Sequence, residues 1–380
     1  MIIGIDLGTT NSLAAYFTED GPRIIPNRLG RHLTPSVVSV DENDQVFVGE
    51  TAKERGFLYP QMTASVFKRD MGSDRKYRLG ARDFTAQDLS SFVLRSLKED
   101  AEAFLQETVE EAVISVPAYF DDKRRKATKR AGELAGLKVE RILSEPTAAA
   151  IAYGLYEKQK NTKFLVFDLG GGTFDVSILE LFENILEVRA VAGDNYLGGE
   201  DFTELLVQHY MDKMGLKLTA LTQKTLGQIR KQAEACKLSY SRAASGTMNC
   251  RIDGEERPLA ITLKEYEKMC EPLLAKIRKP VQRSLSDAHV KLSDIDEIVL
   301  VGGATRLPVV RDFIIRMFKK FPDTAMNPDE AVALGAAIQG AMKERQEAVR
   351  EVILTDVCAF TLGTEVSVRL EDGRIDEGHF

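Results

Sequence analysis

Two short stretches of the sequence carry carboxylates, glycines and hydroxyls in the same order. "IDLGTT" at residues 5–10 places Asp6 just before a Gly-Thr-Thr turn, and "FDLGGGTFDV" at residues 167–176 repeats the Asp-Leu-Gly unit. Glycine lets backbone N–H groups approach a phosphate closely, because it lacks a Cβ atom and accepts positive φ. Carboxylates suit Mg²⁺, a hard cation that keeps several of its waters. These stretches therefore predict the binding of a polyphosphate together with a magnesium ion.

The repetition of the Asp-Leu-Gly unit favours a phosphate-binding site over an ordinary turn. Either stretch alone is also compatible with an ordinary turn after a strand. Two copies with Asp at the same offset favour a clamp that holds one polyphosphate from both sides of a cleft. The side chains that would take part are three carboxylates and three hydroxyls, namely Asp6, Asp168, Asp175, Thr9, Thr10 and Thr173.

A P-loop is the main alternative for a phosphate site, but its pattern fails here. Gly335 and Gly340 stand five residues apart as the motif requires, but Ala341 and Met342 follow where it needs Lys and then Ser or Thr. Both glycines lie in an apolar helical pattern. Close packing of that helix is the better interpretation.

The surrounding sequence alternates strands and helices in two halves. The first half predicts a buried strand over residues 2–7 and a helix over residues 88–105 with Asp88 as its N-cap. The second half predicts helices over residues 200–214, 222–240 and 327–347. Each half opens with an Asp-Leu-Gly turn, which indicates an internally duplicated α/β protein whose two lobes face a cleft.

Composition narrows the class of protein. The 380 residues are 44% hydrophobic and 29% charged with a formal net charge of −7, as in a soluble globular protein of two or three domains. The acidic balance argues against general nucleic-acid binding and against an anionic membrane surface. The N-terminus lacks signal-peptide features, and the four cysteines lack metal or redox spacing, so we expect reduced thiols in a cytoplasmic protein. The abrupt end at residue 380 suggests truncation from a longer protein.

Seven motifs occur in order over almost the whole chain: "GIDLGTTNS", "VPAYF", "EPTAAAIAYG", "FDLGGGTFDVS", "GDNYLGGEDF", "VGGATRLP" and "NPDEAVALGAA". Together they resemble the nucleotide-binding domain of DnaK-type heat-shock chaperones, the Hsp70 family. The resemblance implies an actin-like ATPase fold, in which duplicated ribonuclease-H-like lobes surround a nucleotide cleft. It implies two lobes: lobe I at 1–159, with an outer subdomain at about 36–84, and lobe II at 160–325, with an outer subdomain at about 199–271. The chain would then return to lobe I at 326–350 and continue into a linker at 351–356. Residues 357–380 would be the truncated start of a peptide-binding β-domain.

The resemblance also implies roles for individual residues around ATP or ADP, Mg²⁺ and K⁺. Lys68 matches the catalytic lysine that neutralises the γ-phosphate, and Glu145 would help to orient the attacking water. Asp168 and Thr173 belong to the same catalytic group, and Asp6, Asp168 and Asp175 would hold the water shell of Mg²⁺, with K⁺ nearby. The nucleotide-binding set on this reading is Gly8, Thr9, Thr10, Asn11, Gly170, Gly171, Gly172, Thr173, Gly198, Gly199, Glu200, Glu234, Lys237, Ser241, Gly302, Gly303, Arg306 and Asp329. The spacing of Glu234, Lys237 and Ser241 is by itself that of a solvated helix face, and only the resemblance makes them adenosine contacts.

Further matches concern partners. Pro117 and Arg125 match a relay that senses the nucleotide, and Arg141 matches a contact for a J-domain co-chaperone. The segment with Val352, Ile353, Leu354 and Asp356 resembles the apolar interdomain linker, although a short apolar run of this kind is also typical of an ordinary strand. Clients would be unfolded peptides, held by the peptide-binding domain, and we expect a monomer that binds neither nucleic acid nor membrane. Six of the eight residues at 123–130 are Lys or Arg, and a solvated helix face explains them better than a nucleic-acid patch.

Two regions are shorter than the general DnaK pattern, one between residues 50 and 85 and one at 241–261. Their shortness resembles the specialised HscC branch and makes dependence on the usual bacterial exchange factor doubtful. A small-molecule kinase or a filament protein of the same fold are the alternatives. The kinase would need an Asp base beside a bound hydroxyl, and the filament protein would leave the linker without a purpose.

Overall fold

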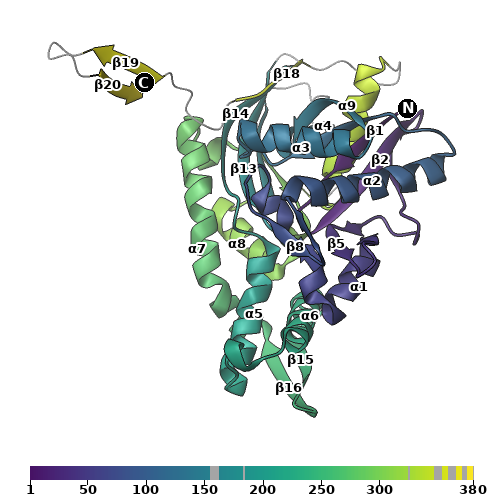
Figure 1. Cartoon of the computed structure of the whole chain (residues 1–380). Coiled ribbons are helices and arrows are strands. Elements are labelled where there is room, and N and C mark those ends of the chain that lie inside the picture. Colours follow the sequence, from purple (N-terminus) through teal and green to yellow (C-terminus); the bar gives the residue numbers. More distant parts are fainter. Residues whose placement is uncertain are drawn as a thin grey trace.

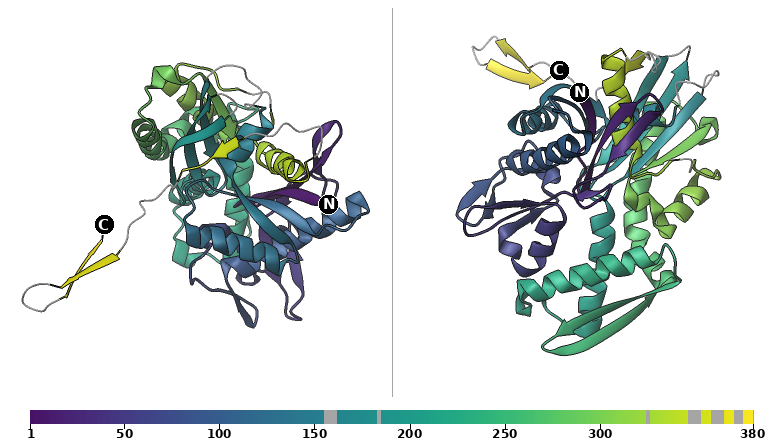
Figure 2. Two further views of the ribbon diagram at one scale, coloured as in Figure 1. Left: turned by 90° about the horizontal axis from the view of Figure 1, so that it is seen from above. Right: turned by 90° about the vertical axis from the view of Figure 1, so that its right-hand side faces the viewer.

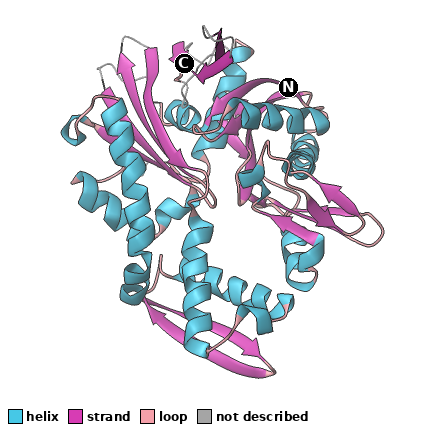
Figure 3. Cartoon of the chain, turned by 60° about the vertical axis from the view of Figure 1, so that its left-hand side comes forward, coloured by secondary structure: helices cyan, strands magenta, loops and turns pink. Residues whose placement is uncertain are grey.

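The computed structural model describes residues 1–154, 162–182, 185–323, 326–345, 353–357, 365–369 and 375–379. Within these residues the chain forms two facing halves, each built on a mixed β-sheet (Figure 3). We call residues 1–154 lobe I and residues 162–323 lobe II. Val352, Cys358 and most of residues 357–380 lie outside the described residues, so the predictions that concern them are not examined by the structure.

The sheet of lobe I has the strand order β11-β10-β1-β2-β3, with the short β4 paired to β2. Its strands are β1 (Ile2–Asp6), β2 (Asn11–Thr18), β3 (Gly21–Ile25), β4 (Thr34–Pro35), β10 (Glu111–Val116) and β11 (Lys138–Ser144). The side chains of Ile3 and Ile5 are fully buried, because β1 lies between neighbouring strands and has helices over both faces. β1 ends at Asp6, so the carboxylate lies at the carboxyl end of this central strand, where the first turn begins.

The sheet of lobe II repeats this arrangement with the order β17-β12-β13-β14-β18. Its strands are β12 (Thr162–Leu169), β13 (Phe174–Phe182), β14 (Ile185–Asp194), β17 (Glu297–Val301) and β18 (Ile353–Thr355). β12 runs antiparallel to β13 and parallel to β17, just as β1 runs antiparallel to β2 and parallel to β10. The internal duplication predicted from the two Asp-Leu-Gly turns is therefore present in the strand order.

Helices cover the two sheets and extend each lobe outward (Figures 1 and 2). Lobe I has α1 (Glu50–Leu58), α2 (Ala86–Leu105), α3 (Asp122–Leu134) and α4 (Glu145–Ala152), and its small outer strands are β5 (Val37–Val40), β6 (Val46–Val48), β7 (Thr63–Ser65), β8 (Tyr77–Leu79) and β9 (Arg82–Phe84). Lobe II has α5 (Gly199–Met214), α6 (Gln223–Ser239), the hairpin β15 (Ser245–Ile252) and β16 (Glu255–Thr262), α7 (Leu263–Asp287) and α8 (Pro308–Phe318). Helix α9 (Ala331–Lys343) follows lobe II in the chain but packs on β1, β2 and β10 of lobe I. The strands β19 (Glu365–Arg369) and β20 (Ile375–His379) form a hairpin that Figure 1 draws apart from the lobes.

Two helix boundaries differ from the sequence prediction. Thr85, not Asp88, is the N-cap of α2: its hydroxyl accepts from the Asp88 N–H at 3.2 Å, and the Asp88 carboxylate accepts from the Thr85 N–H at 2.8 Å. Asp88 is thus the third helical residue of a capping box, a place where an acidic side chain also occurs. Helix α9 starts at Ala331, because Asn327 to Glu330 form a turn that supplies Asp329 to the site described below.

Among the described residues, three large hydrophobic cores hold the structure, one in each lobe and one shared between them, and a fourth, smaller cluster lies between β2 and α9. The shared core contains Val113 of β10, Phe164 and Val166 of β12, and residues of α4 and α9. At its centre α4 and α9 lie so close that a Cβ atom on Gly335 would stand 1.8 Å from the Ala148 carbonyl oxygen. The shared core therefore joins the two lobes at their base. The predicted packing role of Gly335 within it is confirmed.

Replacement of Gly335 by alanine is expected to lower the free energy of unfolding by about 1–3 kcal/mol, since the added methyl must push the α4 backbone away. The Cβ atom of Gly340→Ala would come closest to the Ile2 Cγ2 atom, at 3.0 Å, which a side chain can accommodate. Denaturant titration of both variants checks this. Equal losses for the two glycines would contradict the packing argument.

Candidate functional site

The turn after β1 is held in a tight conformation by buried hydroxyls. Ser12 Oγ accepts from the Gly8 N–H at 3.1 Å, and Ser36 Oγ donates to the Gly8 carbonyl at 2.8 Å. A Cβ atom on Gly8 would lie 1.9 Å from the Asn11 carbonyl oxygen, so only glycine fits. Thr10 Oγ1 is buried and has no hydrogen-bond partner. A buried hydroxyl without a partner is costly, and it is available to a ligand.

The glycine turn after β12 lies directly against this first turn. A Cβ atom on Gly171 would be 1.6 Å from Thr10 Oγ1, and one on Gly172 would be 2.3 Å from Thr9 Cγ2. Gly170 N–H donates to the Thr173 carbonyl at 3.0 Å, which closes the turn. The two stretches that repeat in the sequence therefore meet in space, one from each lobe.

The first turn of α5 lies next to the glycine turn of lobe II. Gly199 N–H donates to the Gly170 carbonyl at 2.9 Å, and Glu200 N–H donates to the Gly171 carbonyl at 2.8 Å. A Cβ atom on Gly198 would stand 2.5 Å from the Gly172 nitrogen. The positive end of the α5 dipole is thus directed at the place where both turns converge, which favours negative charge there. Burial, and next to it the charge of Glu234, raises the pKa of Glu200.

Three carboxylates (Glu145, Asp168 and Asp175) and Lys68 are buried beside the two turns, and a fourth carboxylate, Asp6, is half-buried there. Lys68 Nζ lies 2.8 Å from Glu145 Oε1, and these residues are 3% and 6% exposed. Asp6 accepts from Ser115 Oγ at 3.0 Å, while Asp168 and Asp175 stand opposite each other on β12 and β13. One ammonium group cannot neutralise these four carboxylates, so the site has an excess of negative charge. Such an excess is satisfied by a cation or by protons.

The pKa values of the three aspartates record this excess. Burial, followed by repulsion from Glu145, raises the pKa of Asp6 to about 7 and that of Asp175 to about 8. The same two causes raise the pKa of Asp168 well above its usual range. A hydrated divalent cation fits this donor set, because it would favour the ionised carboxylates. Among the described residues, no three His, Cys, Asp or Glu side chains lie close enough together to ligate one ion directly.

We expect the ligand-free protein to lose stability as the pH rises from about 4 to about 8. The folded-state pKa values of Asp6 and Asp175, about 7 and about 8, lie above the ordinary value of 3.8, so the folded state binds more protons than the unfolded state across this window. Thermal melts at several pH values check this, and Asp175→Asn should flatten the profile. A melting temperature that climbs with pH in the ligand-free protein would contradict it.

Comparison with known proteins identifies the family. The model of the family "Hsp70 protein" matches residues 2–79 and 75–378. The chaperone protein DnaK of Thermotoga petrophila is 45% identical over 379 residues, which cover 96% of this chain and 63% of the relative. DnaK of Thermosipho africanus is 44% identical and DnaK of Thermosipho melanesiensis is 42% identical, each over 378 residues with the same coverage. The chain belongs to the Hsp70 family.

Family membership confirms the predicted actin-like ATPase fold and the predicted assignment to the Hsp70 family. The chain spans less than two thirds of the length of these relatives. None of the helices in the described ranges is long and apolar enough to cross a bilayer.

The residues predicted for the nucleoside lie on lobe II and on the turn before α9. Lys237 on α6 is buried, and its Nζ donates to the Gly199 carbonyl at 3.0 Å and lies 2.7 Å from the Glu234 carboxylate. Ser241 follows the end of α6, is exposed, and donates to the Leu238 carbonyl at 2.7 Å. The structure thus brings Glu234 and Lys237 together and leaves Ser241 at the rim.

A third glycine turn, at Gly302 and Gly303, follows β17 of lobe II. Gly302 adopts a φ of 82°, and a Cβ atom on Gly303 would stand 2.6 Å from Asp329 Oδ1. Arg306 Nη2 lies 2.8 Å from Asp329 Oδ2. Burial raises the pKa of Asp329, and the Arg306 guanidinium opposes that shift. Gly302, Gly303, Arg306 and Asp329 therefore form one local cluster.

The predicted relay contacts the carboxylates through one loop. Arg125 on α3 donates to the carbonyls of Phe120 at 3.1 Å and Ala118 at 3.4 Å, which holds the loop that begins at Pro117. Tyr119 N–H in that loop donates to Asp175 Oδ1 at 3.2 Å. Arg141 stands apart from this loop, exposed on β11.

Ile353, Leu354 and Thr355 of the predicted linker form β18, which pairs in parallel with β14. Leu354 is half-buried at the edge of the shared core, while Ile353 is 62% exposed and Asp356 is exposed. The apolar run is thus an edge strand of the lobe II sheet.

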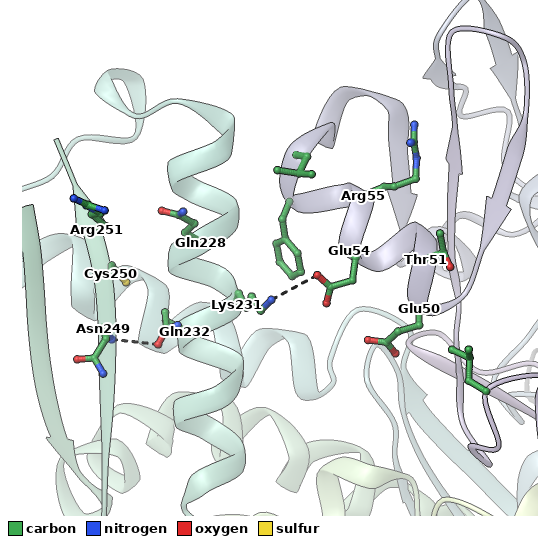
Figure 4. A pocket seen from close by; sticks show the side chains of 13 residues that line it. Glu50, Thr51, Glu54, Arg55, Gln228, Lys231, Gln232, Asn249, Cys250 and Arg251 are labelled. Atoms are coloured by element: carbon green, nitrogen blue, oxygen red, sulfur yellow. Dashed lines mark hydrogen bonds and ion pairs between the residues drawn. The ribbon is translucent and has the colours of Figure 1, made fainter. Parts of the chain in front are cut away.

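A cavity of about 760 Å³ lies farther out, between α1 of lobe I and α6 and β15 of lobe II (Figure 4). Lys231 Nζ is 3.7 Å from Glu54 Oε2 across it and 4.5 Å from the centre of the Phe57 ring. Both ion-pair partners are more than half exposed, so the pair is weak. None of the predicted phosphate-binding residues lines this cavity. We call the cavity the outer mouth, because it lies between the outer parts of the two lobes.

Sequence reasoning missed several residues of the site. Arg69, directly after Lys68, donates to the Gly172 carbonyl at 2.7 Å. Thr203 Oγ1 donates to Glu234 at 2.6 Å and accepts from Lys237 at 2.8 Å. The position of Arg69 next to a predicted catalytic residue was an available signal, whereas nothing in the sequence marks Thr203.

Proposed function

We propose that this chain binds ATP with Mg²⁺ where the two glycine turns meet and hydrolyses it slowly to ADP and phosphate. The observation that supports this most directly is the buried group of Lys68, Glu145 and three aspartates with raised pKa values beside the unpartnered Thr10 hydroxyl. A polyphosphate would satisfy the Thr10 hydroxyl, and a hydrated cation would satisfy the carboxylates.

Each group has a part in this proposal. The turns at Gly8 to Asn11 and at Gly170 to Thr173 bind the β- and γ-phosphates, assisted by Gly198, Gly199 and Glu200 at the start of α5. Asp6, Asp168 and Asp175 would hold Mg²⁺ through its waters, with K⁺ nearby, and the cation would offset the charge of the phosphates. Lys68 neutralises charge on the γ-phosphate, and Glu145 orients both Lys68 and the attacking water. Glu234, Lys237, Ser241, Gly302, Gly303, Arg306 and Asp329 surround the nucleoside.

Slow hydrolysis follows from the state of Glu145. This carboxylate is held at 2.8 Å by Lys68, so it is a poor general base. The site thus offers positioning and charge stabilisation with little help in removing the proton of water. We expect turnover to depend on a partner that repositions the lobes.

Thermal unfolding tests the nucleotide proposal. Saturation with ATP or ADP and Mg²⁺ at a hundredfold excess over Kd should stabilise the protein by about 2.7 kcal/mol. A melting temperature that no nucleotide changes would overturn the proposal. Turnover that depends on an added sugar would instead identify a small-molecule kinase, and sedimentation with ATP would identify a filament protein.

We further propose the division of the chain into lobe I at 1–159, lobe II at 160–325, a return to lobe I at 326–350, a linker at 351–356 and the start of a peptide-binding β-domain at 357–380. The packing of α9 on the lobe I sheet and the separate β19–β20 hairpin support it. On this basis the whole protein is a monomeric chaperone of the bacterial cytoplasm. A J-domain co-chaperone contacts Arg141. Unfolded client peptides are the substrates of the whole protein. ATP turnover measured with a panel of J-domains tests the co-chaperone.

The compact β15–β16 hairpin supports a place in the HscC branch. The usual bacterial exchange factor would then have little surface to hold, and it should not speed the release of labelled ADP in a stopped-flow experiment. A tenfold acceleration would exclude this proposal.

Residues 352–380 are expected to speed ATP hydrolysis, because the linker docks on lobe II by a marginal balance of free energies. Full burial of Leu354 would contribute roughly 1.5–3 kcal/mol, whereas ordering each linker residue costs about 1–2 kcal/mol. A small rotation of the lobes then decides whether β18 stays paired with β14. Single-turnover rates should be higher for the whole chain than for one ending at Glu351.

Leu354→Asp should abolish this difference, since Leu354 packs on the shared core. Ile353→Asp is the matched control, because its side chain is 62% exposed and should matter less. Equal rates with and without residues 352–380 would refute the coupling and leave the ATPase proposal intact.

A further inference from the structure

Arg69 crosses from lobe I to the phosphate turn of lobe II. It follows Lys68 in the short 3-10 turn η2 (Phe67–Asp70). Its Nε donates to the Gly172 carbonyl at 2.7 Å, and its Nη2 lies 2.7 Å from Asp201 Oδ2 in the first turn of α5. The side chains of Arg69 and Asp201 are 18% and 29% exposed, so this pair is more shielded from water than the Lys231–Glu54 pair at the outer mouth.

Both partners of Arg69 are fixed parts of lobe II. A Cβ atom on Gly172 would be 2.3 Å from Thr9 Cγ2 and 3.1 Å from Arg69 Nε, so lobe I holds Gly172 from two sides. The Asp201 carboxylate also accepts from the Gly198 N–H at 2.8 Å, which ties it to the start of α5. Arg69 therefore contacts the glycine turn and the helix that supports it.

The turn that carries Arg69 is rigid. Val66, which precedes it, has a φ of 58°, a left-handed conformation that a β-branched residue rarely adopts. Such strain persists only where the surroundings hold it. Met71 N–H donates to the Lys68 carbonyl at 3.1 Å, and Arg69 N–H donates to the Val66 carbonyl at 3.2 Å. A displacement of Arg69 therefore also displaces Lys68.

We infer that Arg69 is a latch between the lobes and a positioning residue for hydrolysis. By holding Gly172 and Asp201, it links closure of the lobes to the placement of Lys68 at the γ-phosphate; this role in hydrolysis rests on the proposed function. Arginine suits the task because its planar guanidinium offers donors at fixed angles to two acceptors, which lysine does not. Loss of the latch opens the lobes, slows hydrolysis and speeds the release of ADP.

The test compares Arg69 with a nearby arginine, Arg75. Arg69→Met removes the contact between the lobes, whereas Arg75→Met removes an exposed pair within lobe I. Asp201→Asn keeps an oxygen that can accept from Gly198 N–H but removes the charge. Spin labels at Lys53→Cys on α1 and Lys224→Cys on α6, in a Cys358→Ser background, report the distance between the lobes without any nucleotide. Single-turnover hydrolysis and release of labelled ADP report the chemistry.

We expect Arg69→Met to lengthen or broaden the label distance, to lower single-turnover hydrolysis about tenfold and to speed ADP release several-fold, with Arg75→Met unchanged. Asp201→Asn should act in the same direction, and the double variant Arg69→Met/Asp201→Asn should be no worse than Arg69→Met alone. Arg69→Lys should rescue only in part, and it replaces Arg69→Met if that variant does not fold. An unchanged label distance would overturn the latch. A protein that shows the distance change but never hydrolyses ATP would keep the latch and exclude the proposed function.

Discussion

Replacing Lys68 with alanine is expected to lower the rate of ATP hydrolysis by about 10²–10³, the usual cost of removing one donor that stabilises charge in a transition state. Lys68 is the cation buried among Glu145 and the three aspartates, and it is 3% exposed. Nucleotide binding should survive, because the phosphate contacts come from the two glycine turns. Single-turnover hydrolysis and a Kd for ADP measure the two effects separately.

The variant also leaves Glu145 buried without its partner, which costs stability. Lys68→Ala should therefore melt at a lower temperature than Lys68→Ala/Glu145→Ala, while both hydrolyse poorly. Glu145→Ala and Thr173→Ala alone should reduce the rate less, since each shares its task with neighbours. A Lys68→Ala protein that folds but binds no nucleotide would assign Lys68 to binding instead of catalysis.

Replacing Gly171 with alanine should weaken nucleotide binding by up to about a hundredfold, which corresponds to the upper part of the 1–3 kcal/mol that overpacking costs. The new Cβ atom would lie 1.6 Å from Thr10 Oγ1 and 2.6 Å from Thr10 Cβ. Rotation of the Thr10 side chain cannot relieve the second contact, so the turns of the two lobes must separate. Titration with ADP and Mg²⁺ measures the loss.

Gly170→Ala is the matched control, because its nearest new contact is the Thr173 carbonyl oxygen at 3.7 Å. It should bind nucleotide nearly as well as the natural chain. Equal Kd values for the Gly171→Ala and natural proteins would show that the close approach of the turns does not matter for binding.

Features of this protein that have a local cause could be predicted from its sequence. The two Asp-Leu-Gly turns could be recognised because glycine, carboxylate and hydroxyl follow one another within a few residues, and their repetition predicted the duplicated sheets. The motifs were sufficient to assign the Hsp70 family. Even the error at α2 was local: Asp88 was assigned as the cap when Thr85 and Asp88 form a reciprocal pair.

The contacts between the two lobes could not be predicted from the sequence, because they depend on the folded arrangement of distant segments. Arg69 and Gly172 stand 103 residues apart, and Arg69 and Asp201 stand 132 apart, so no sequence spacing announces their contact. The raised pKa values of Asp6, Asp168 and Asp175 likewise arise from burial and from Glu145, which reaches the cluster through α4. Desolvation and charge repulsion depend on distances in space, whereas a motif records only distances along the chain. The chemistry of each turn is therefore readable from the sequence, and the coupling between the turns is set by the fold.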